Sequence, residues 1–236
     1  CIMRFANRTV FVTGASRGFG QAIAQAFRDE GAKVVGTATS PDAFGDACHE
    51  WFPVNFTDES QLDSCAERLA QIAPDILINN AGINRIAPFA EISPDDFKTI
   101  QQVNVMAPFR LCQAALPVML SRQWGRIVNI SSIWGKISIA QRASYSTSKF
   151  ALDGLTLALA AEHTENGILA NCIAPGFFDT ELTRRVLGEA GIEDLTSRVP
   201  AKRLGSVDEI ARLVKRLYSE EKNLIPRQTQ AIDGRI

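Results

Sequence analysis

Short apolar runs alternate with longer amphipathic stretches along the chain, and this alternation limits the fold more than any other feature of the sequence. Strands that are apolar on both faces must be covered on both faces, which is typical of parallel sheets with helical crossovers. A length of 236 residues suits one ordinary domain. We therefore expect a single α/β domain (1–236) with a doubly wound parallel sheet of about seven strands and helices on both faces.

The pattern assigns most of the chain to individual elements. The expected strands are Thr9–Thr13, Lys33–Thr37, Trp51–Val54, Ile76–Asn79, Ile127–Ile130, Ile168–Ile173 and Thr229–Ile232. The expected helices cover Gln21–Glu30, Asp58–Ile72, about Asp95–Ser121 and about Ala143–His163. Ligands of such sheets bind beyond the carboxyl ends of the strands, where the winding reverses. Functional residues should therefore follow the strands directly.

Composition excludes several classes of protein. Apolar residues make up 46% and charged residues 22%, as in globular proteins, and the net charge of -1 offers no basic field for nucleic acid. We find neither an apolar run of about 20 residues nor a charged-then-apolar leader. We expect a cytoplasmic protein that binds neither nucleic acid nor a membrane.

The cysteines and histidines suggest no metal site and no disulfide framework. The cysteines are odd in number and scattered without a CxxC pair, and the histidines lack metal or triad spacing. We interpret the thiols as reduced and the two histidines as structural or surface residues. These residues are Cys1, Cys48, Cys65, Cys112, Cys172, His49 and His163.

A glycine-rich loop, TGASRGFG at Thr13–Gly20, lies between the first strand and the first helix. Glycine lets the backbone turn tightly and approach a pyrophosphate, and the helix amino terminus adds free N–H donors. Glycines alone also fit a plain strand–helix turn, but the flanking strand and helix favour a nucleotide site. The candidate contacts in the loop are Gly14, Ser16, Arg17, Gly18, Phe19 and Gly20.

The end of the second strand indicates which nucleotide binds. Sites for NAD usually place a carboxylate there to hold the ribose 2′-hydroxyl, whereas this strand runs into Thr37, Ala38 and Thr39. Arg17 could pair with a 2′-phosphate, or it could be a solvated surface arginine. The missing acid and the available guanidinium favour NADP(H), with Thr37 and Thr39 as further contacts.

Polar and small residues follow the next two strands. Asn55, after the third strand, could meet the adenine. Asn80, Ala81 and Gly82, after the fourth strand, could let the backbone approach the nucleotide and brace the sheet. Asn79 and Asn80 also fit a structural turn, and both roles can hold together.

Four residues have the chemistry for ketone reduction, which needs a hydride donor, a proton donor and a group that holds the carbonyl oxygen. Tyr145 and Lys149 share one face of a predicted helix, so the ammonium would stabilise a phenolate. Ser132 follows the fifth strand and would hydrogen-bond the substrate oxygen. Asn104, a poor helix former inside a helical stretch, could hold a water that feeds protons past Lys149.

Together these motifs resemble the short-chain dehydrogenase/reductase family over nearly the whole chain. The matching segments are Thr13–Gly20, Asn79–Gly82, Asn104, Ser132, Tyr145-x-x-x-Lys149 and Pro175-Gly176 with Thr180. The resemblance implies a Rossmann-like fold and a Ser–Tyr–Lys–Asn catalytic set, with Ser132 chosen over Ser131. It also implies a homo-oligomer, a dimer or tetramer, and contacts to the nicotinamide side. Those contacts would come from Pro175, Gly176, Phe178 and Thr180.

Within the family, the stretches TGASRGFG, GAKVVGTATS and VPAKRLGSVDEIA are most similar to bacterial 3-oxoacyl-[acyl-carrier-protein] reductases. Two departures leave docking of acyl carrier protein in doubt. Gln123 and Asn166 stand where those reductases carry docking arginines, although Arg122 is adjacent to the first. The altered tail at Pro226–Thr229 leaves the oligomeric state open.

The resemblance divides the domain into a nucleotide-binding part (about 8–125) and a catalytic and substrate part (about 126–236), with a lid at about 177–203. Trp134, Arg142, Phe177 and Leu182 are candidates to line the substrate pocket, although Arg142 could equally be solvated. We expect reduction of a 3-oxoacyl thioester by NADPH. The alternatives are a pathway-specific reductase of a secondary-metabolite, sugar or other small carbonyl, and a non-catalytic NADP(H)-binding regulator, which should have a broken catalytic set.

Overall fold

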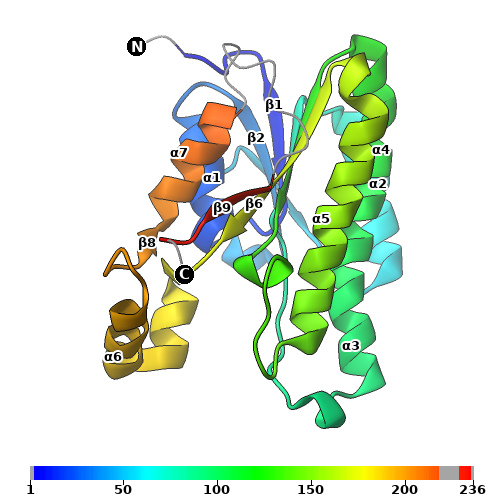
Figure 1. Cartoon of the computed structure of the whole chain (residues 1–236). Coiled ribbons are helices and arrows are strands. Elements are labelled where there is room, and N and C mark those ends of the chain that lie inside the picture. Colours follow the sequence, from blue (N-terminus) through cyan, green and yellow to red (C-terminus); the bar gives the residue numbers. More distant parts are fainter. Residues whose placement is uncertain (1–2, 218–228, 235–236) are drawn as a thin grey trace.

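A computed structural model describes residues 3–217 and 229–234 and has a parallel seven-stranded sheet at its centre (Figure 1). The strand order is β3-β2-β1-β4-β5-β6-β9, and every neighbouring pair is parallel. The strands are β1 Thr9–Val12, β2 Lys33–Ala38, β3 Glu50–Pro53, β4 Ile76–Asn79, β5 Gly125–Ile130, β6 Ile168–Pro175 and β9 Thr229–Ile232. The predicted seven-stranded parallel sheet is confirmed.

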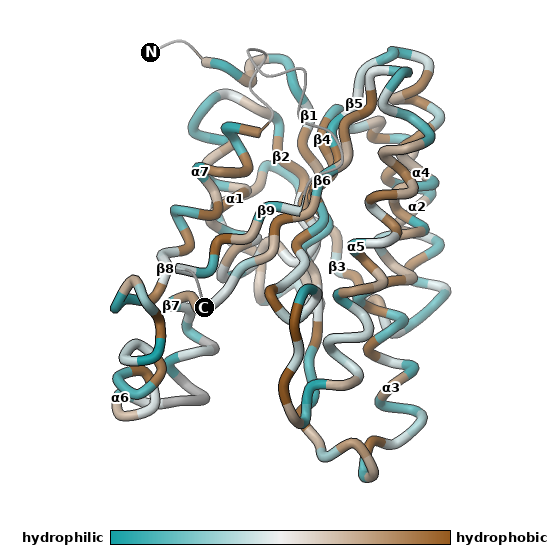
Figure 2. Tube along the Cα trace, viewed as in Figure 1, coloured by the Kyte–Doolittle hydropathy of each residue, from teal (hydrophilic) through white to brown (hydrophobic). Residues whose placement is uncertain are grey.

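Helices cover both faces of the sheet, as predicted (Figure 1). On one face α1 (Gly18–Arg28) and α7 (Val207–Leu217) pack against the strands, and Phe27 and Ile210 of these helices are fully buried. On the other face lie α2 (Glu59–Ile72), α4 (Ala107–Arg122) and α5 (Ala143–His163). Figure 2 shows hydrophobic stretches along the central strands, which supply both cores.

The winding reverses between β1 and β4, and this switch point positions the candidate site. The chain builds outward from β1 to β3, then returns to place β4 on the other side of β1. Loops leaving β1 and β4 therefore diverge to opposite faces of the sheet and leave room beyond the carboxyl ends of these strands. The glycine loop and the Asn79–Gly82 segment both begin there.

The long helical stretch expected at about Asp95–Ser121 has three parts. It consists of α3 (Pro94–Gln101), a π-helical turn at Gln102–Met106, and α4. By length and composition alone this stretch, Pro94–Arg122, could cross a membrane, and it is the one such helix among the described residues. Length and composition are weak evidence, because a core helix meets the same test, and Leu111 and Met119 of α4 lie in the core.

The predicted lid has more structure than the sequence pattern indicates. The short strands β7 (Phe178–Asp179) and β8 (Gly205–Ser206) pair beside the main sheet, and α6 (Glu181–Arg198) lies between them along the chain. A non-helical residue, Gly188 at φ 63°, interrupts α6. Two-residue strands carry no periodicity, so no sequence pattern could identify them.

The four cysteines in the described part of the chain are free and buried. Burial raises the pKa of the thiols of Cys48, Cys65 and Cys112 to about 12. These side chains are therefore protonated at neutral pH and serve as small core residues.

A charged cap fixes the start of α7. The Glu209 carboxylate accepts a hydrogen bond from the Ser206 backbone N–H at 2.8 Å, in the manner of a capping box. The Arg203 guanidinium donates to both Glu209 oxygens, at 2.9 and 2.7 Å. These bonds, from Arg203 first and Ser206 second, lower the pKa of Glu209 from 4.5 to about 2.

The Glu209 cap predicts a component of acid denaturation. Because the folded-state pKa is depressed, the cap's contribution is complete above about pH 4.5 and is lost as the pH falls through about 2. Glu209→Gln should lower the urea midpoint at pH 7, and its difference from the wild type should shrink between pH 4.5 and 2.5. Glu162→Gln, on an exposed carboxylate, is the control. A difference that stays constant over this range would contradict the assignment.

Candidate active site

The glycine loop after β1 is tightly closed on itself. Gly14 has φ +63°, a left-handed conformation that favours glycine, and a Cβ on Gly20 would lie 2.1 Å from the Gly14 carbonyl oxygen. The Asn80 amide donates to the carbonyl oxygens of Thr13 and Gly14, at 3.0 Å each. The loop conformation thus depends on a side chain from the neighbouring loop after β4.

The threonines at the strand ends complete this bracing. The Thr13 hydroxyl accepts hydrogen bonds from the backbone N–H groups of Asn80 (2.9 Å) and Ala81 (3.0 Å). The Thr37 hydroxyl, at the end of β2, accepts one from the Gly14 N–H at 3.2 Å. Thr37 and Asn80 therefore use these polar atoms to shape the loop, and their predicted direct contacts with a cofactor stay predictions.

The remaining predicted nucleotide contacts surround this braced core. Arg17, at the N-cap of α1, and Thr39, just past β2, are exposed, and Arg17 forms no ion pair with any residue in the described ranges. Ser16 is half-buried beside them. A Cβ on Gly18 would meet no atom within 4 Å, so its φ of +56° is what favours glycine there.

Asn55 follows β3, as predicted, and is exposed. Its side-chain oxygen accepts from the backbone N–H and the hydroxyl of Thr57, at 3.1 and 2.9 Å. This turn leads into the N-cap of α2, which is Asp58. The predicted contact of Asn55 with the adenine stays a prediction.

Lys149 and Tyr145 lie together on the first turns of α5. Lys149 is only 4% exposed, and its ammonium donates to the Ile130 carbonyl oxygen at the end of β5, at 2.8 Å. The same ammonium lies 5.4 Å from the centroid of the half-buried Tyr145 ring. Ser132, two residues past Ile130, is buried and caps the turn Ile133–Gly135 through a hydrogen bond from the Trp134 N–H. The structure therefore brings the three predicted side chains to one edge of the sheet.

Asn104 reaches the same edge because the helix widens into the π-helical turn around it. Its amide donates to the Ile83 carbonyl oxygen and accepts from the Ile83 N–H, both at 2.9 Å. It also donates to the Ser148 hydroxyl at 2.9 Å, and that hydroxyl donates to the Tyr145 carbonyl oxygen at 2.7 Å. Such π-helical turns recur at functional sites.

Ser148 and Gly82 connect this group of side chains. Ser148 is a functional residue that the sequence does not indicate, because a serine inside a helix carries no signal by itself. A Cβ on Gly82 would lie 3.3 Å from the Asn104 side-chain oxygen and 3.6 Å from the Lys149 ammonium. The predicted residue Gly82 thus lets the loop after β4 approach both polar groups.

The chain leaving β6 borders the site from the other side. The Gly176 N–H donates to the Ile232 carbonyl oxygen at 2.8 Å, and a Cβ on Gly176 would lie 2.6 Å from the Asp233 Cα. Phe178 is 4% exposed, and its ring meets the Phe19 ring edge-on at 5.2 Å. These contacts fix the exit from Pro175, and Thr180 then caps α6 by accepting from the Thr183 N–H at 3.1 Å.

Two of the candidate pocket residues contact each other. The rings of Trp134 and Phe177 meet at 6.1 Å in an edge-on arrangement, which joins the Ser132 turn to the segment after β6. Arg142, at the N-cap of α5, is half-buried. The side chain of Leu182 lies outside the described residues, as does the Pro226–Gln228 part of the altered tail.

The positions that raised doubt about carrier-protein docking lie side by side. Gln123 ends α4 in a left-handed conformation, and a Cβ on Gly167, the residue after Asn166, would lie 2.1 Å from the Gln123 carbonyl oxygen. Arg122 donates to the Ala73 carbonyl oxygen at 3.0 Å and pairs with Asp75 at 3.4 Å. Arg122 is therefore bound to the turn after α2.

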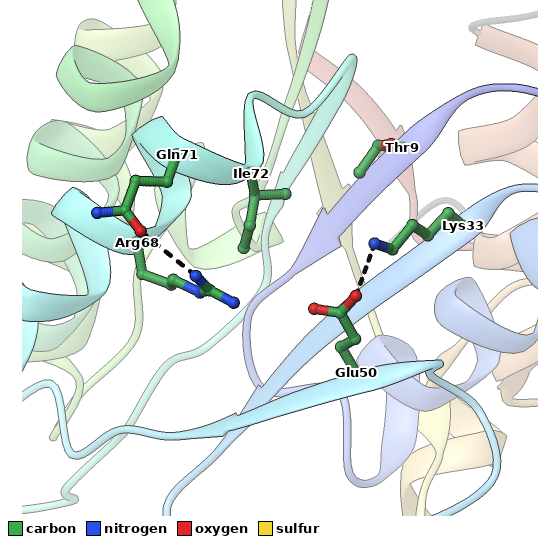
Figure 3. A pocket seen from close by; sticks show the side chains of 6 residues that line it. All are labelled: Thr9, Lys33, Glu50, Arg68, Gln71 and Ile72. Carbon is green, nitrogen blue, oxygen red and sulfur yellow. Dashed lines mark hydrogen bonds and ion pairs between the residues drawn. The ribbon is translucent and has the colours of Figure 1, made fainter.

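A cavity lies at the opposite, amino-terminal edge of β1–β3 (Figure 3). It measures about 270 Å³, and Lys33, Glu50 and Arg68 line it with Thr9, Gln71 and Ile72. Its cations are already partnered, Lys33 by Glu50 at 2.6 Å and Arg68 by Gln71 at 3.3 Å. This cavity contains none of the predicted site residues, and we assign it no function.

Comparison with known proteins identifies the class. The model of the short chain dehydrogenase family matches residues 8–190, and the chain belongs to this family of oxidoreductases. The chain is 37% identical, over 98% of both sequences, to a 3-oxoacyl-[acyl-carrier-protein] reductase of Salmonella typhimurium.

Two solved structures have the same fold over nearly the whole chain. A putative NAD(P)-dependent gluconate 5-dehydrogenase of Beutenbergia cavernae with bound NADP at low occupancy has a TM-score of 0.92 at 31% identity, covering 99% and 98% of the two chains. A 3-oxoacyl (acyl-carrier-protein) reductase of Agrobacterium tumefaciens with NADP bound has a TM-score of 0.93 at 27% identity, covering 100% and 96%.

The closed glycine loop predicts a sharp difference between two glycines. Gly20→Ala would drive a methyl group into the Gly14 carbonyl, so we expect a loss of about 1–3 kcal/mol in the free energy of unfolding and weaker binding of NADPH. Gly45→Ala, at a position with open space, is the matched control. Urea denaturation and fluorescence titration with NADPH would measure both effects. Wild-type stability and affinity in Gly20→Ala would show that the loop is not closed in this way.

Proposed function

We propose that this protein is an NADPH-dependent reductase of a ketone, with Tyr145 as the proton donor. The observation that carries the proposal is the assembly of Lys149, Tyr145, Ser132 and Asn104 at the carboxyl edge of the sheet. The residues come from three separate segments of the chain, and a protein that only bound nucleotide would not require all four. This intact set argues against the non-catalytic regulator.

The proposed mechanism uses each side chain for a different task. Bound NADPH supplies the hydride for the carbonyl carbon. Tyr145 donates its proton to the carbonyl oxygen, and the nearby Lys149 ammonium stabilises the charge left on the phenolate. Ser132 hydrogen-bonds the same substrate oxygen and holds it in place. Asn104 holds the loop after β4 through Ile83 and holds α5 through Ser148, and so positions both segments beside Lys149.

Several features support NADP(H) as the cofactor. The braced loop leaves backbone at Gly18 unobstructed, as a pyrophosphate requires. Arg17 and Thr39 are exposed beside the end of β2, where no carboxylate opposes a 2′-phosphate. Two solved relatives hold NADP. The proposed division into a nucleotide part (8–125) and a catalytic part (126–236) with a lid (177–203) follows from this arrangement.

We propose a 3-oxoacyl thioester as the substrate, in accord with the 37% identical reductase. The aromatic pair Trp134–Phe177 offers an apolar wall to an acyl chain, and the half-buried Arg142 offers a cation. A second candidate is a free hydroxy- or keto-acid of the sugar type. It is favoured by Gln123 and Asn166 in place of docking cations and by the gluconate 5-dehydrogenase-like neighbour.

Turnover measurements test the reaction, the cofactor and the substrate together. Purified protein should oxidise NADPH in preference to NADH with acetoacetyl-CoA, and Tyr145→Phe should lower kcat about 10²- to 10⁴-fold because the proton donor is lost. Thr147→Val, on an exposed face of the same helix, is the matched control. Turnover of gluconate or 5-ketogluconate instead would select the second candidate. Equal activity of Tyr145→Phe and wild type would refute the mechanism.

We also propose that the protein is a homo-oligomer. An apolar stripe on α5 is exposed at helical spacing, with Phe150, Ala151, Gly154, Leu157 and Ala158 along it. Phe150 is 49% and Leu157 45% exposed, and Phe109 on α4 is a further exposed aromatic residue. A continuous apolar stripe of this kind is typical of a protein–protein contact.

Replacement of one stripe residue tests this assembly. Leu157→Glu should shift the protein to a smaller species in sedimentation velocity, because a charge would be buried in the contact without a partner. Glu162→Gln, on an exposed side chain near the end of the same helix, should leave the sedimentation coefficient unchanged. A wild-type monomer at micromolar concentration would rule out the proposed oligomer.

A further inference from the structure

Asp153 is a buried carboxylate that the proposed reaction does not use. It lies on α5 and is 4% exposed, and the described groups beside its carboxylate are an ammonium and a thiol. Its one ion-pair partner in the described part of the chain is the ammonium of Lys136, at 2.9 Å from Oδ2. A buried charge with so few donors persists only if its partner is held in place.

The pair joins two of the three segments that carry the catalytic side chains. Lys136 closes the 3-10 turn that begins at Ser132, because its backbone N–H donates to the Ile133 carbonyl oxygen at 2.8 Å. Asp153 follows Lys149 by four residues and so lies on the same face of α5. The ion pair therefore connects the turn of Ser132 to the helix face of Lys149.

Backbone packing places the turn directly on the helix at this point. A Cβ on Gly135 would lie 3.0 Å from both the carbonyl carbon and oxygen of Lys149, and 2.9 Å from the Ser131 hydroxyl. Any separation of the turn from α5 would therefore move Ser132 away from Tyr145 and Lys149. Van der Waals contact at a glycine limits approach but resists separation only weakly.

We propose that Lys136 and Asp153 form a positioning pair that holds the Ser132 turn against α5 and thereby sets the spacing of the serine and tyrosine hydroxyl groups. The proposal rests on the proposed reductase function for its kinetic consequences. Lys136 is 44% exposed along its side chain, so its apolar stem contributes little burial and its charge is what Asp153 requires. The Cys172 thiol of β6 also lies beside Asp153, and its pKa is raised by burial first and by the Asp153 charge second.

Three variants separate positioning from simple stabilisation. Lys136→Met removes the ammonium but keeps the stem, Lys136→Arg restores a cation, and Lys136→Met combined with Asp153→Leu removes both charges so that no carboxylate is left unpaired. We expect Lys136→Met to lower kcat about 10- to 100-fold, with the KM for NADPH within about twofold of wild type. Lys136→Arg should recover most of the loss. The double variant should fold stably but retain the low kcat.

Hydrogen exchange measured by mass spectrometry gives a readout independent of turnover. Lys136→Met should speed exchange in the peptide that spans 131–142, which contains the Gly135 N–H bonded to the Ser132 carbonyl oxygen, and leave α1 unchanged. Lys98→Met, which removes a lysine of an exposed ion pair, should change neither kcat nor exchange.

The outcomes are distinguishable. Slower turnover together with faster exchange in 131–142, both reversed by Lys136→Arg, supports the positioning pair. Unchanged exchange, or wild-type kcat, in Lys136→Met overturns it. If the wild-type protein reduces no ketone, the proposed function fails, and the exchange result alone then supports or overturns the positioning of the Ser132 turn.

Discussion

The burial of the Lys149 ammonium is the constraint on which the rest of the site depends. A cation that is 4% exposed must be solvated by protein dipoles, and the Ile130 carbonyl oxygen provides one at 2.8 Å. Ile130 is the last residue of β5, so this hydrogen bond connects α5 to the carboxyl edge of the sheet. The position of Tyr145 follows from the helix period, and the position of Asn104 follows from its bond to Ser148.

A second set of neutral hydrogen bonds builds the nucleotide side of the same edge. Thr13 and Asn80 bind each other's loops reciprocally, so the loops after β1 and β4 are shaped together even though 67 residues separate them along the chain. Gly20 must lack a side chain because the loop carbonyl of Gly14 occupies the space. The loop shape that would admit a pyrophosphate therefore depends on contacts between loops of neighbouring strands. The strand order β2-β1-β4 brings these loops together.

Ion pairs stabilise segments that lie outside the hydrogen-bonded main sheet. The buried Asp153 joins the Ser132 turn to α5 through Lys136, and Arg203 with Glu209 fixes the start of α7 after the proposed lid. Arg122 donates a hydrogen bond to the Ala73 carbonyl oxygen in the turn after α2.

The sequence by itself determined the seven strands of the main sheet, the helical stretches between them up to α5, and the identity of the chemical groups, but it indicated neither α6 nor α7. Ile76–Asn79, Ala143–His163 and Thr229–Ile232 have the predicted bounds because uninterrupted apolar runs and helical periodicity are local properties. Tyr145 and Lys149 could be paired from their spacing alone. Only the tertiary structure decided that Asn104 lies in a π-helical turn, that Ser148 links it to α5, and that Lys136 meets Asp153. These contacts join residues far apart along the chain, and they form only when the folded sheet brings its loops to one edge, so no local pattern of residues encodes them.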